Sequence, residues 1–494
     1  MTGRSSYSTS LATTAHRLFR CRSITMRLLA PLAAMLLLSG VAAAEGPALS
    51  LRVADVLALQ ERCGSEAAQN ESFELAEKCV AAGAGTQLTK IQAFEEHRHF
   101  VYALGFGTIP VEASESGKSA PVFFRSVILL KPRTVVVVDG IFAGESKGPF
   151  QWLLRSDARP EVADGRIRIA RENGEILCET LSPEKTTTEK ISVTDGEKPD
   201  GGYCARVTAA GDKGHAVFVH VLHLRTADEK DSAARSELVK IDDQHQLTVS
   251  TPQRVFRLTS ADGGSIEITT ADGEILLPKR LLPAGVLPHG PEGVRLMERW
   301  DSAYHGDRRP GWDIGRPSSE LQKAVESGAV KPGKAVVLGC GTGTNAIYLA
   351  GKGFDVTGID IAPTALARAK AKADKAGVKV RWMVADVLNL PENLGPVDFI
   401  FDRGCYHGVR RSNAAGYVET VRRLSQPGTQ LLILAGNANE ERQYGPPRVR
   451  EEELRGDFSA SFDFQWLREI RFDSADPNAT GAMAWSAMLR RKAE

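Results

Sequence analysis

The stretch that decides the fold reads Ala335-Val-Val-Leu-Gly339-Cys-Gly341-Thr-Gly343-Thr-Asn-Ala-Ile-Tyr-Leu-Ala350. An apolar run typical of a buried strand is followed by glycines and then by a segment with helical character. Glycines let the backbone approach a bound molecule closely, and the first N–H groups of a helix face its polar end. The stretch therefore predicts a nucleotide-binding turn in a doubly wound α/β sheet.

The glycine spacing separates two classes of nucleotide-binding fold. Dinucleotide-binding domains carry a glycine where this chain has Thr344, whereas the spacing of Gly339, Gly341 and Gly343 is the form that methyltransferases use. Cys340 lies between the first two glycines and is expected to contact the cofactor through its backbone. A glycine turn alone is a weak signal, so the strands that follow it carry the interpretation further.

Acidic residues follow or end the next three predicted strands. Asp360, about twenty residues beyond the first glycine, is placed to accept hydrogen bonds from a ribose diol. Asp386 is expected near the adenine. The predicted cofactor contacts are Asp360 at the end of strand 354–360 with Ile361 after it, Asp386 and Val387 after strand 379–384, and Asp402 at the end of strand 397–402.

The remaining elements complete a seven-stranded count. Helices are predicted over 363–375 and 415–424, a strand over 430–434, and a closing antiparallel pair over 463–471 and 482–489. The predicted fold class is thus an α/β Rossmann-type seven-stranded methyltransferase domain preceded by an antiparallel β-sandwich.

Two more specific motifs resemble the thiopurine, thiol and tellurite methyltransferase group. Residues 300–304 (Trp-Asp-Ser-Ala-Tyr) and 311–321 (Gly-Trp-Asp-Ile-Gly-Arg-Pro-Ser-Ser-Glu-Leu) resemble its N-terminal cap, and residues 401–407 (Phe-Asp-Arg-Gly-Cys-Tyr-His) resemble its fourth-strand motif. The resemblance covers essentially the whole predicted domain 294–494. It implies that S-adenosyl-L-methionine is the cofactor.

The same resemblance implies roles for three cap and strand residues. Trp312 is expected to pack on the cofactor, and Arg403 to contact its carboxylate end. For Arg316, support of the cap through a structural ion pair and direct contact with the ligand are both open.

Methyl transfer from a sulfonium mainly requires that nucleophile, methyl group and sulfur be aligned in a dry pocket, and it requires no metal. A thiol with a pKa of about 8.5 supplies thiolate near neutral pH, so a strong base is optional. His407 and Tyr406 follow the fourth strand and are predicted to line the acceptor pocket. His407 is the best candidate for a base, and packing against the cap is the alternative. The acceptor itself is left open among thiols, thiopurines, tellurite and other small nucleophiles.

Composition points to two folded units and a small-molecule partner. A chain of 494 residues exceeds what one hydrophobic core usually serves. Its 62 basic and 61 acidic residues give no basic excess, which argues against nucleic-acid binding. Residues 281–293 concentrate Pro and Gly and are predicted to link the units.

Residues 45–280 show the period-two alternation of an antiparallel sandwich, with a helical segment near 51–80. Expected strands include 99–104, 122–130, 134–138, 151–155, 215–224 and 265–270. Residues 91–102, 125–132 and 135–139 resemble the C-terminal β-sandwich of heparinase II/III-like polysaccharide lyases, which implies polysaccharide as a possible partner. Lyase activity is not implied, because the α-helical toroid of that family has no counterpart here.

The histidines and cysteines of this region do not predict a metal site or a catalytic site. His220 and His223 are three apart on a strand, so their side chains point to opposite faces and cannot share a metal. His97 and His99 are predicted to share a strand face, but no third ligand is evident. Two alternatives are open for the cysteines. They form disulfides, such as 63 with 79 and 178 with 204, or they are four buried thiols.

The first 44 residues resemble a secretory signal. A basic stretch precedes an apolar segment over 28–44 that ends in Ala42-Ala-Ala44. Export is the favoured prediction; an uncleaved membrane anchor and retention in the cytoplasm are alternatives, and translation from Met26 is open. Because the cofactor is made in the cytosol, export also favours a second function hypothesis. In that hypothesis the chain is an exported carbohydrate-binding or scaffold protein with an inactive methyltransferase fold.

Overall fold

The computed structural model describes residues 47–63, 72–81, 87–109, 121–143, 149–192, 202–209, 214–227, 234–241, 244–260, 264–306, 309–476 and 478–493. The chain forms two compact units, divided between Leu282 and Pro283, with Gln92–Glu95 counted in the second unit. This division falls inside the segment predicted as a linker. The signal-like segment 1–44 lies outside the described residues. No described helix is both long enough and apolar enough to span a membrane.

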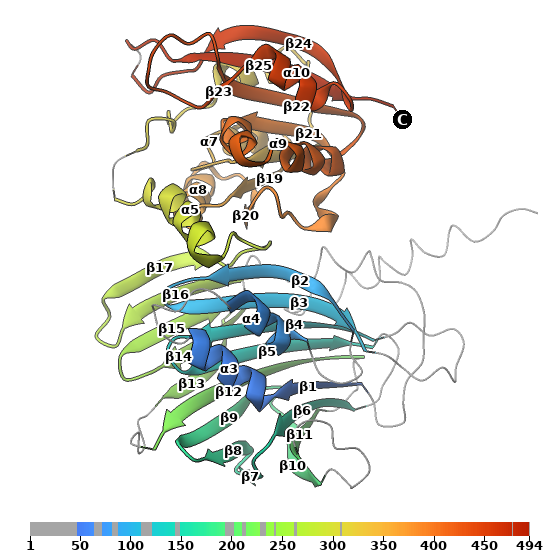
Figure 1. Ribbon diagram of the computed structural model, residues 1–494, viewed down its shortest axis with the longest axis vertical. Helices are drawn as coiled ribbons and strands as arrows, with labels where there is room; N and C mark the ends of the chain where they lie inside the picture. Colours follow the sequence, from blue (N-terminus) through green and yellow to red (C-terminus); the bar gives the residue numbers. More distant parts are fainter. Residues whose placement is uncertain are drawn as a thin grey trace, which may run out of the picture. The chain divides into compact units, whose positions relative to one another are not determined.

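The described residues of the first unit form three sheets and two helices (Figure 1). The sheets have the orders β2-β3-β4-β5-β12-β9-β8-β7, β1-β6-β11-β10 and β13-β14-β15-β16-β17. Its helices are α3 (Val53–Cys63) and α4 (Ser72–Val80), and its strands are β1 (Ala48–Arg52), β2 (Gln87–Glu96), β3 (Phe100–Thr108), β4 (Val122–Leu130), β5 (Thr134–Phe142), β6 (Phe150–Ser156), β7 (Pro160–Ala163), β8 (Arg166–Arg171), β9 (Gly174–Ser182), β10 (Thr186–Ser192), β11 (Tyr203–Ala209), β12 (His215–Thr226), β13 (Arg235–Ile241), β14 (Gln244–Ser250), β15 (Arg254–Thr259), β16 (Ser265–Thr270) and β17 (Ile275–Leu281).

Strand β12 contacts both of the other sheets described in this unit, whereas a strand of a simple two-sheet sandwich would face only one. On one of its faces, His220 stacks on Trp152 of β6 with ring centroids 3.6 Å apart. On the other, His223 Nε2 lies 3.0 Å from the Ser236 hydroxyl of β13. The strand is therefore covered on both sides. The two histidines point to opposite faces as predicted, and both are buried.

Two charged residues of the segments 125–132 and 135–139 lie in the core. Arg125 and Asp139 are completely buried and form a bidentate ion pair with both N–O distances at 2.7 Å. The Trp152 indole N–H also donates to Asp139, at 2.8 Å. A buried pair with its hydrogen bonds satisfied fixes how sheets pack, so these residues hold the first unit together.

Two local predictions for this unit need correction or a decision between alternatives. His97 and His99 lie in the turn between β2 and β3, where the His99 N–H donates to His97 Nδ1 at 3.2 Å, and not on a shared strand face. The described residues contain no group of three side chains that could hold a metal ion. Of the two alternatives for the cysteines, the structure shows the second, because Cys63, Cys79, Cys178 and Cys204 are free, buried thiols.

The second unit has the sheet order β20-β19-β18-β21-β22-β25-β24, with a short β23 beside β22. Strands β18 to β22 pair in parallel and β25 runs antiparallel to both neighbours, which confirms the predicted fold class. Its elements are α5 (Gly290–Ser302), α6 (Ser319–Glu326), β18 (Lys334–Leu338), α7 (Thr344–Gly351), β19 (Asp355–Asp360), α8 (Pro363–Ala376), β20 (Arg381–Val384), η2 (Glu392–Leu394), β21 (Val397–Arg403), α9 (Cys405–Leu424), β22 (Ser425–Asn437), β23 (Arg448–Val449), α10 (Glu451–Phe458), β24 (Phe462–Arg471) and β25 (Met483–Arg491).

Local sequence explains these elements. Strand β18 is apolar because helices cover a parallel sheet on both faces. Helix α8 begins at Pro363, which suits the first turn, and ends at Gly377 in the left-handed conformation with φ 69°. Helix α9 begins ten residues earlier than the predicted segment 415–424, because its first turn includes the apparent strand-end motif Cys405-Tyr-His.

Candidate functional site

The glycine turn joins β18 to α7, and its three glycines have φ values of 59°, 53° and 77°. Only glycine adopts this conformation readily. A Cβ on Gly343 would lie 2.4 Å from the Trp382 ring. Glycine is therefore needed at this position because the Trp382 side chain occupies the adjacent space. A Cβ on Gly341 would lie 3.1 Å from the Tyr304 hydroxyl, which comes from the segment after α5. The turn is thus compact and covered by the cap.

Asp360, the predicted ribose ligand, lies at the end of β19 beside this turn. Its two carboxylate oxygens accept the Gly341 N–H at 2.7 Å and the Ala362 N–H at 2.9 Å. The Ile361 N–H also bonds to this carboxylate, so three of its roughly four acceptor positions are used and one is left for a ligand hydroxyl. Burial, opposed by these backbone bonds, raises the pKa of Asp360 to about 6.

Aromatic residues of the cap gather over the turn. The Trp312 indole N–H donates to the Tyr304 hydroxyl at 2.9 Å, and the Trp312 ring meets the Trp300 ring edge-on at 5.9 Å. Tyr304 is 4% exposed, whereas Trp312 is 48% exposed. An aromatic surface that is anchored at one edge and half open is available for stacking on a ligand, as predicted for Trp312.

Three polar residues fasten the loop that carries Trp312 and Asp313, here called the cap loop, to the glycine turn. The Asp313 carboxylate accepts the Thr342 hydroxyl at 2.8 Å, and Lys372 Nζ of α8 lies 2.5 Å from the same hydroxyl oxygen. Lys372 is also 3.8 Å from the Asp313 carboxylate. The Asp313 side chain is only 8% exposed, so this contact is largely shielded from water. We refer to Asp313, Thr342 and Lys372 as the cap latch.

Two arginines join the cap loop to the segment after β24. Arg403 donates to the Trp312 carbonyl at 3.0 Å and to the Asp473 carbonyl at 3.4 Å, and its guanidinium lies 5.1 Å from the Phe472 ring centroid. Its Nε is buried and makes no hydrogen bond to another described residue. Arg316 donates to the Ser474 carbonyl at 3.0 Å. Arg316 thus makes one structural contact in the cap, its contact with a ligand stays a prediction, and Arg403 retains a donor.

Asp402 does not face this site, contrary to the prediction. The side chain is completely buried. Its oxygens accept the Cys405 and Tyr406 N–H groups at 3.0 and 2.9 Å and the Tyr417 hydroxyl at 2.6 Å. Asp402 thus caps the start of α9 from inside the core. Burial raises its pKa to about 7.

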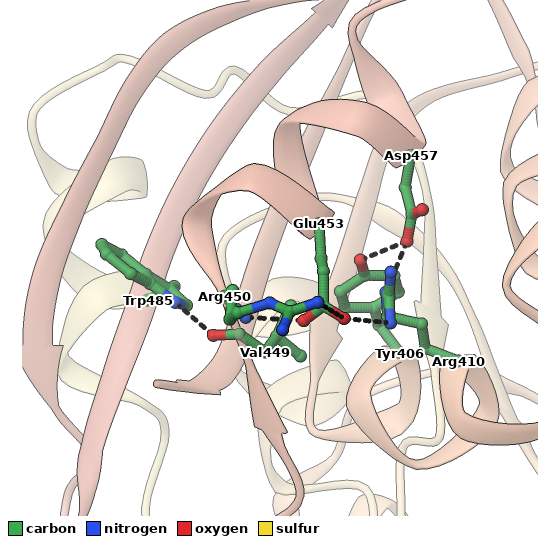
Figure 2. A network of polar contacts seen from close by, with 7 residues as sticks. All are labelled: Tyr406, Arg410, Val449, Arg450, Glu453, Asp457 and Trp485. Atoms are coloured by element: carbon green, nitrogen blue, oxygen red, sulfur yellow. Dashed lines mark hydrogen bonds and ion pairs between the residues drawn. The ribbon is translucent and has the colours of Figure 1, made fainter. Parts of the chain in front are cut away.

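Tyr406 was predicted to line the acceptor pocket and instead belongs to the core. It is completely buried, and its hydroxyl donates to Asp457 of α10 at 2.6 Å. Figure 2 shows Asp457 also accepting from Arg410, which reaches Glu453 as well, so that α9 and α10 are joined by a polar network. In a helix, consecutive side chains point in different directions, and Tyr406 takes the inward one.

His407 was predicted to line the acceptor pocket, which stays a prediction, and its hydrogen bond and charge state argue against the predicted role as a base. Its Nδ1 accepts the Gly436 N–H of β22 at 2.9 Å. A neutral imidazole that accepts through Nδ1 carries its proton on Nε2. Burial, helped by the Arg403 charge, lowers the pKa of His407 to about 4. The group is therefore a neutral hydrogen-bond donor near pH 7.

The remaining predicted cofactor contacts are Cys340, Ile361, Asp386 and Val387. Cys340 donates its N–H to the Ile359 carbonyl at 2.9 Å, as expected for a residue that acts through its backbone. Ile361 follows Asp360 and is half-buried. Asp386 accepts the Leu388 N–H at 3.0 Å, and burial raises its pKa. Val387 is buried, with its carbonyl accepting the Thr420 hydroxyl at 2.9 Å. Their contacts with a cofactor stay predictions.

Sequence reasoning missed several residues of the site. Tyr304 was quoted within the cap motif but was given no role, although an aromatic at that spacing was a signal. For Lys372 there was no signal in the sequence, because it is one of several lysines on an Ala- and Lys-rich helix. Trp382 and Phe472 lie beyond the motifs, and only the fold brings them to the turn and to Arg403.

Comparisons with known proteins identify this region. The sequence model of the thiopurine S-methyltransferase family matches residues 296–488. A 2-heptyl-1-hydroxyquinolin-4(1H)-one methyltransferase of Mycobacteroides abscessus is 34% identical over 169 residues, which cover 32% of this chain and 74% of the relative. A probable thiol methyltransferase 2 of Arabidopsis thaliana is 28% identical over 149 residues, covering 30% of this chain and 65% of the relative, slightly under two thirds.

A solved structure is also similar to part of the chain. It comes from a study of the conversion of a disulfide bond into a thioacetal group during echinomycin biosynthesis. It is 28% identical and covers 40% of this chain and 93% of its own, with a TM-score of 0.36.

Proposed function

Because the chain belongs to the thiopurine S-methyltransferase family, and its second unit is an S-adenosylmethionine-dependent methyltransferase, we propose that it methylates a small, soft nucleophile. The candidates are thiols, thiopurines and tellurite-like anions. The observation that carries the proposal is the aromatic cap over the glycine turn, with Arg403 beside it. These contacts place an aromatic surface and a guanidinium group beside the turn that would hold the cofactor.

The residues present fit S-adenosylmethionine. The glycine turn and Asp360 would hold the ribose, since the Asp360 carboxylate keeps acceptor capacity beyond its three backbone hydrogen bonds. The buried Nε of Arg403 is a donor that the carboxylate end of the cofactor would satisfy, and Trp312 would stack on the bound molecule. When bound, the cofactor supplies an electrophilic methyl group on a sulfonium.

This chain's own residues contribute alignment and exclusion of water. The cap latch keeps the loop with Trp312 close to the glycine turn. Arg403 ties the same loop to Asp473, so two independent contacts hold the cover in place. A displacement at carbon gains most from such positioning, which converts an encounter of two molecules into a reaction within one complex.

Relatives suggest which acceptors to try first. The named acceptors of the two relatives are a hydroxylated quinolone and, for the plant protein, a thiol. We therefore propose aromatic thiols and N-hydroxylated heteroaromatics as the first acceptor panel.

Two measurements on the full chain test this function. Isothermal titration should show binding of both S-adenosylmethionine and its demethylated product. A mass-spectrometric assay with thiols, thiopurines, tellurite and hydroxyquinolones should then show methyl transfer to at least one class. Absence of cofactor binding would favour the second function hypothesis, an exported binding protein with an inactive fold.

Export and polysaccharide binding are separate proposals. We propose that the chain leaves the cytosol, because the basic and apolar run before Glu45 has the composition of a cleaved signal. N-terminal sequencing of fractionated protein tests this: a soluble cytosolic product that retains residues before Ala44 would contradict it. Polysaccharide binding by the first unit is tested by a pull-down with insoluble glycans.

A further inference from the structure

We propose that the second unit binds a doubly charged oxyanion in a cavity of about 260 Å³ behind the cap loop. The ligand is a phosphate group, either free or on a small organic molecule. Arg309 and Lys372 hold it, and the bound group joins the cap loop to helix α8. Because Lys372 also belongs to the cap latch, the anion slows the release of the cofactor, and this consequence rests on the proposed function.

The cavity lies between the cap loop and two helices. Helices α7 and α8 pack against each other, and Thr344, Ile347 and Tyr348 line the cavity from the first turns of α7. Lys372 lines it from α8, and Arg309 lines it from the cap loop. None of the described residues predicted to contact the cofactor is among the lining residues. The cavity is therefore a second site and not an extension of the cofactor site.

The position of Arg309 explains a glycine of the cap loop. A Cβ on Gly315 would lie 2.3 Å from Arg309 Nη1, and Gly315 has a φ of 70°, so the loop leaves room for the guanidinium. Within the part of the chain that the structure describes, Arg309 forms no ion pair and no hydrogen bond. A guanidinium presents several N–H groups in one plane, which suits an oxyanion. These donors are therefore available to a ligand.

Positive charge exceeds negative charge around the cavity. Burial lowers the pKa of Lys372, and the charges of Arg309 and Arg368 lower it further, while Asp313 opposes the decrease. Arg368 donates to the Gly306 carbonyl and has no carboxylate partner among the described residues. Three cations thus meet a single carboxylate, whose side chain is only 8% exposed. The excess of two charges favours a dianion over a monocarboxylate.

The other lining residues favour an organic group beside the charge. Ile347, Pro317 and Tyr348 contribute apolar surface to the cavity. The Tyr348 hydroxyl donates to Glu326 at 3.3 Å, and Glu326 lies 3.9 Å from Lys352 Nζ, so this carboxylate has a cation of its own. A phosphomonoester with a small apolar group should therefore bind more tightly than inorganic phosphate.

Lys372 connects the cavity to the loop over the cofactor site. Its Nζ lies 2.5 Å from the Thr342 hydroxyl oxygen and 3.8 Å from the carboxylate of Asp313, the residue after Trp312. An ammonium group has three donors, so it can keep these contacts and also bind an anion. An anion held by Arg309 and Lys372 restrains the loop that carries Trp312. Restraint of a covering loop slows the release of the ligand beneath it.

The first test is isothermal titration of the full chain with phenyl phosphate and with inorganic phosphate, at constant ionic strength. One series contains S-adenosylhomocysteine, the demethylated cofactor, so that Arg403 is occupied. Arg309→Gln keeps a polar side chain but removes the charge, and it should weaken phenyl phosphate about tenfold. Arg295→Gln is the matched control, because Arg295 lies on α5 and pairs with Glu292, and it should change nothing.

Two results would overturn the anion site. One is the absence of phenyl phosphate binding to the unchanged protein. The other is equal affinity in Arg309→Gln and Arg295→Gln, which would show that the anion binds elsewhere.

The second test measures the coupling to the cofactor. Phenyl phosphate should slow the dissociation of S-adenosylhomocysteine about threefold, and each ligand should tighten the other by the same factor, because coupling free energy is reciprocal. Arg309→Gln should bind S-adenosylhomocysteine normally and lose this effect. A dissociation rate that phenyl phosphate does not change contradicts the restraint of the cap loop. If S-adenosylhomocysteine does not bind at all, the proposed function has failed and the coupling with it, whereas the first titration still decides the anion site.

Discussion

The ends of strands β19 and β21 look alike in sequence and differ in the folded protein. Both strands flank β18 and both end near a carboxylate, Asp360 and Asp402. Asp360 is 8% exposed and holds the glycine turn, whereas Asp402 is completely buried and caps α9. The difference arises because strand β21 continues one residue past Asp402, to Arg403, which takes the position toward the cap. Successive side chains of a strand alternate between faces.

This comparison separates ligand binding from folding. A carboxylate with spare lone pairs at a covered turn can serve a ligand, while one whose hydrogen bonds go to a helix start and a tyrosine serves stability. Burial raises the pKa of both groups, so a perturbed pKa alone does not identify the functional one. Substitutions at the two strand ends should therefore affect different measurements.

The largest expected effect is on stability, at Asp402. Asp402→Ala leaves buried N–H and hydroxyl donors without an acceptor and should lower the free energy of unfolding of the second unit by about 3 kcal/mol. Chemical denaturation measures this. If the loss is within experimental error and cofactor affinity falls instead, the comparison of the two strand ends is wrong.

The pH dependence of stability follows from the same residue. Folding raises the pKa of Asp402 from 3.8 to about 7, so the folded chain binds a proton that the unfolded chain releases in this range. Stability attributable to this group should accordingly decrease as pH rises from about 4 to about 7. Asp402→Asn does not titrate and should flatten that part of the stability curve.

Asp360 should affect binding. Asp360→Ala should weaken S-adenosylmethionine by about 1.5–3 kcal/mol, since the ribose would lose charge-assisted hydrogen bonds. Affinity in the unchanged protein should also fall as pH drops below about 6, because the carboxyl then becomes protonated. Isothermal titration measures both. Asp355→Ala, at the exposed start of the same strand, is the control and should bind normally.

A substitution of Tyr406 tests whether this residue contributes to stability or to catalysis. Tyr406→Phe removes the hydrogen bond to Asp457 and should cost about 1 kcal/mol of stability, while the methyl-transfer rate stays within about twofold. Denaturation and an acceptor assay on the same preparation decide this. A rate lowered tenfold at unchanged stability would restore the predicted catalytic role.

The smallest effect is expected at the cap latch. Lys372→Ala removes one hydrogen-bond partner of Thr342 and should raise the dissociation rate of S-adenosylmethionine about threefold, with little change in stability. Stopped-flow tryptophan fluorescence measures this rate. Lys370→Ala on the same helix, where Lys370 pairs with Asp374, should leave it unchanged. Equal rates for both variants would show that the latch does not restrain the cofactor.

Sequence reasoning reached the fold and the glycine turn for clear reasons. Strand and helix periodicity, the spacing of Gly339, Gly341 and Gly343, and the cap motif are all local, so they survive without knowledge of the fold. The prediction that Tyr406 lines the acceptor pocket was wrong. Tyr406 and His407 are neighbours in a segment that reads as the end of a strand but forms the first turn of α9, which turns Tyr406 into the core.

The sequence by itself determined the α/β class of the second unit, its methyltransferase family and the placement of Asp360 at the turn, because each depends on short-range spacing. Only the tertiary structure decided which carboxylate faces the site, which proton His407 carries and which lysine reaches the cap loop. Those properties depend on partners 15 to 30 residues away in the chain, such as Tyr417, Gly436 and Lys372. A hydrogen bond between such distant residues leaves no periodic mark on the sequence that could predict it.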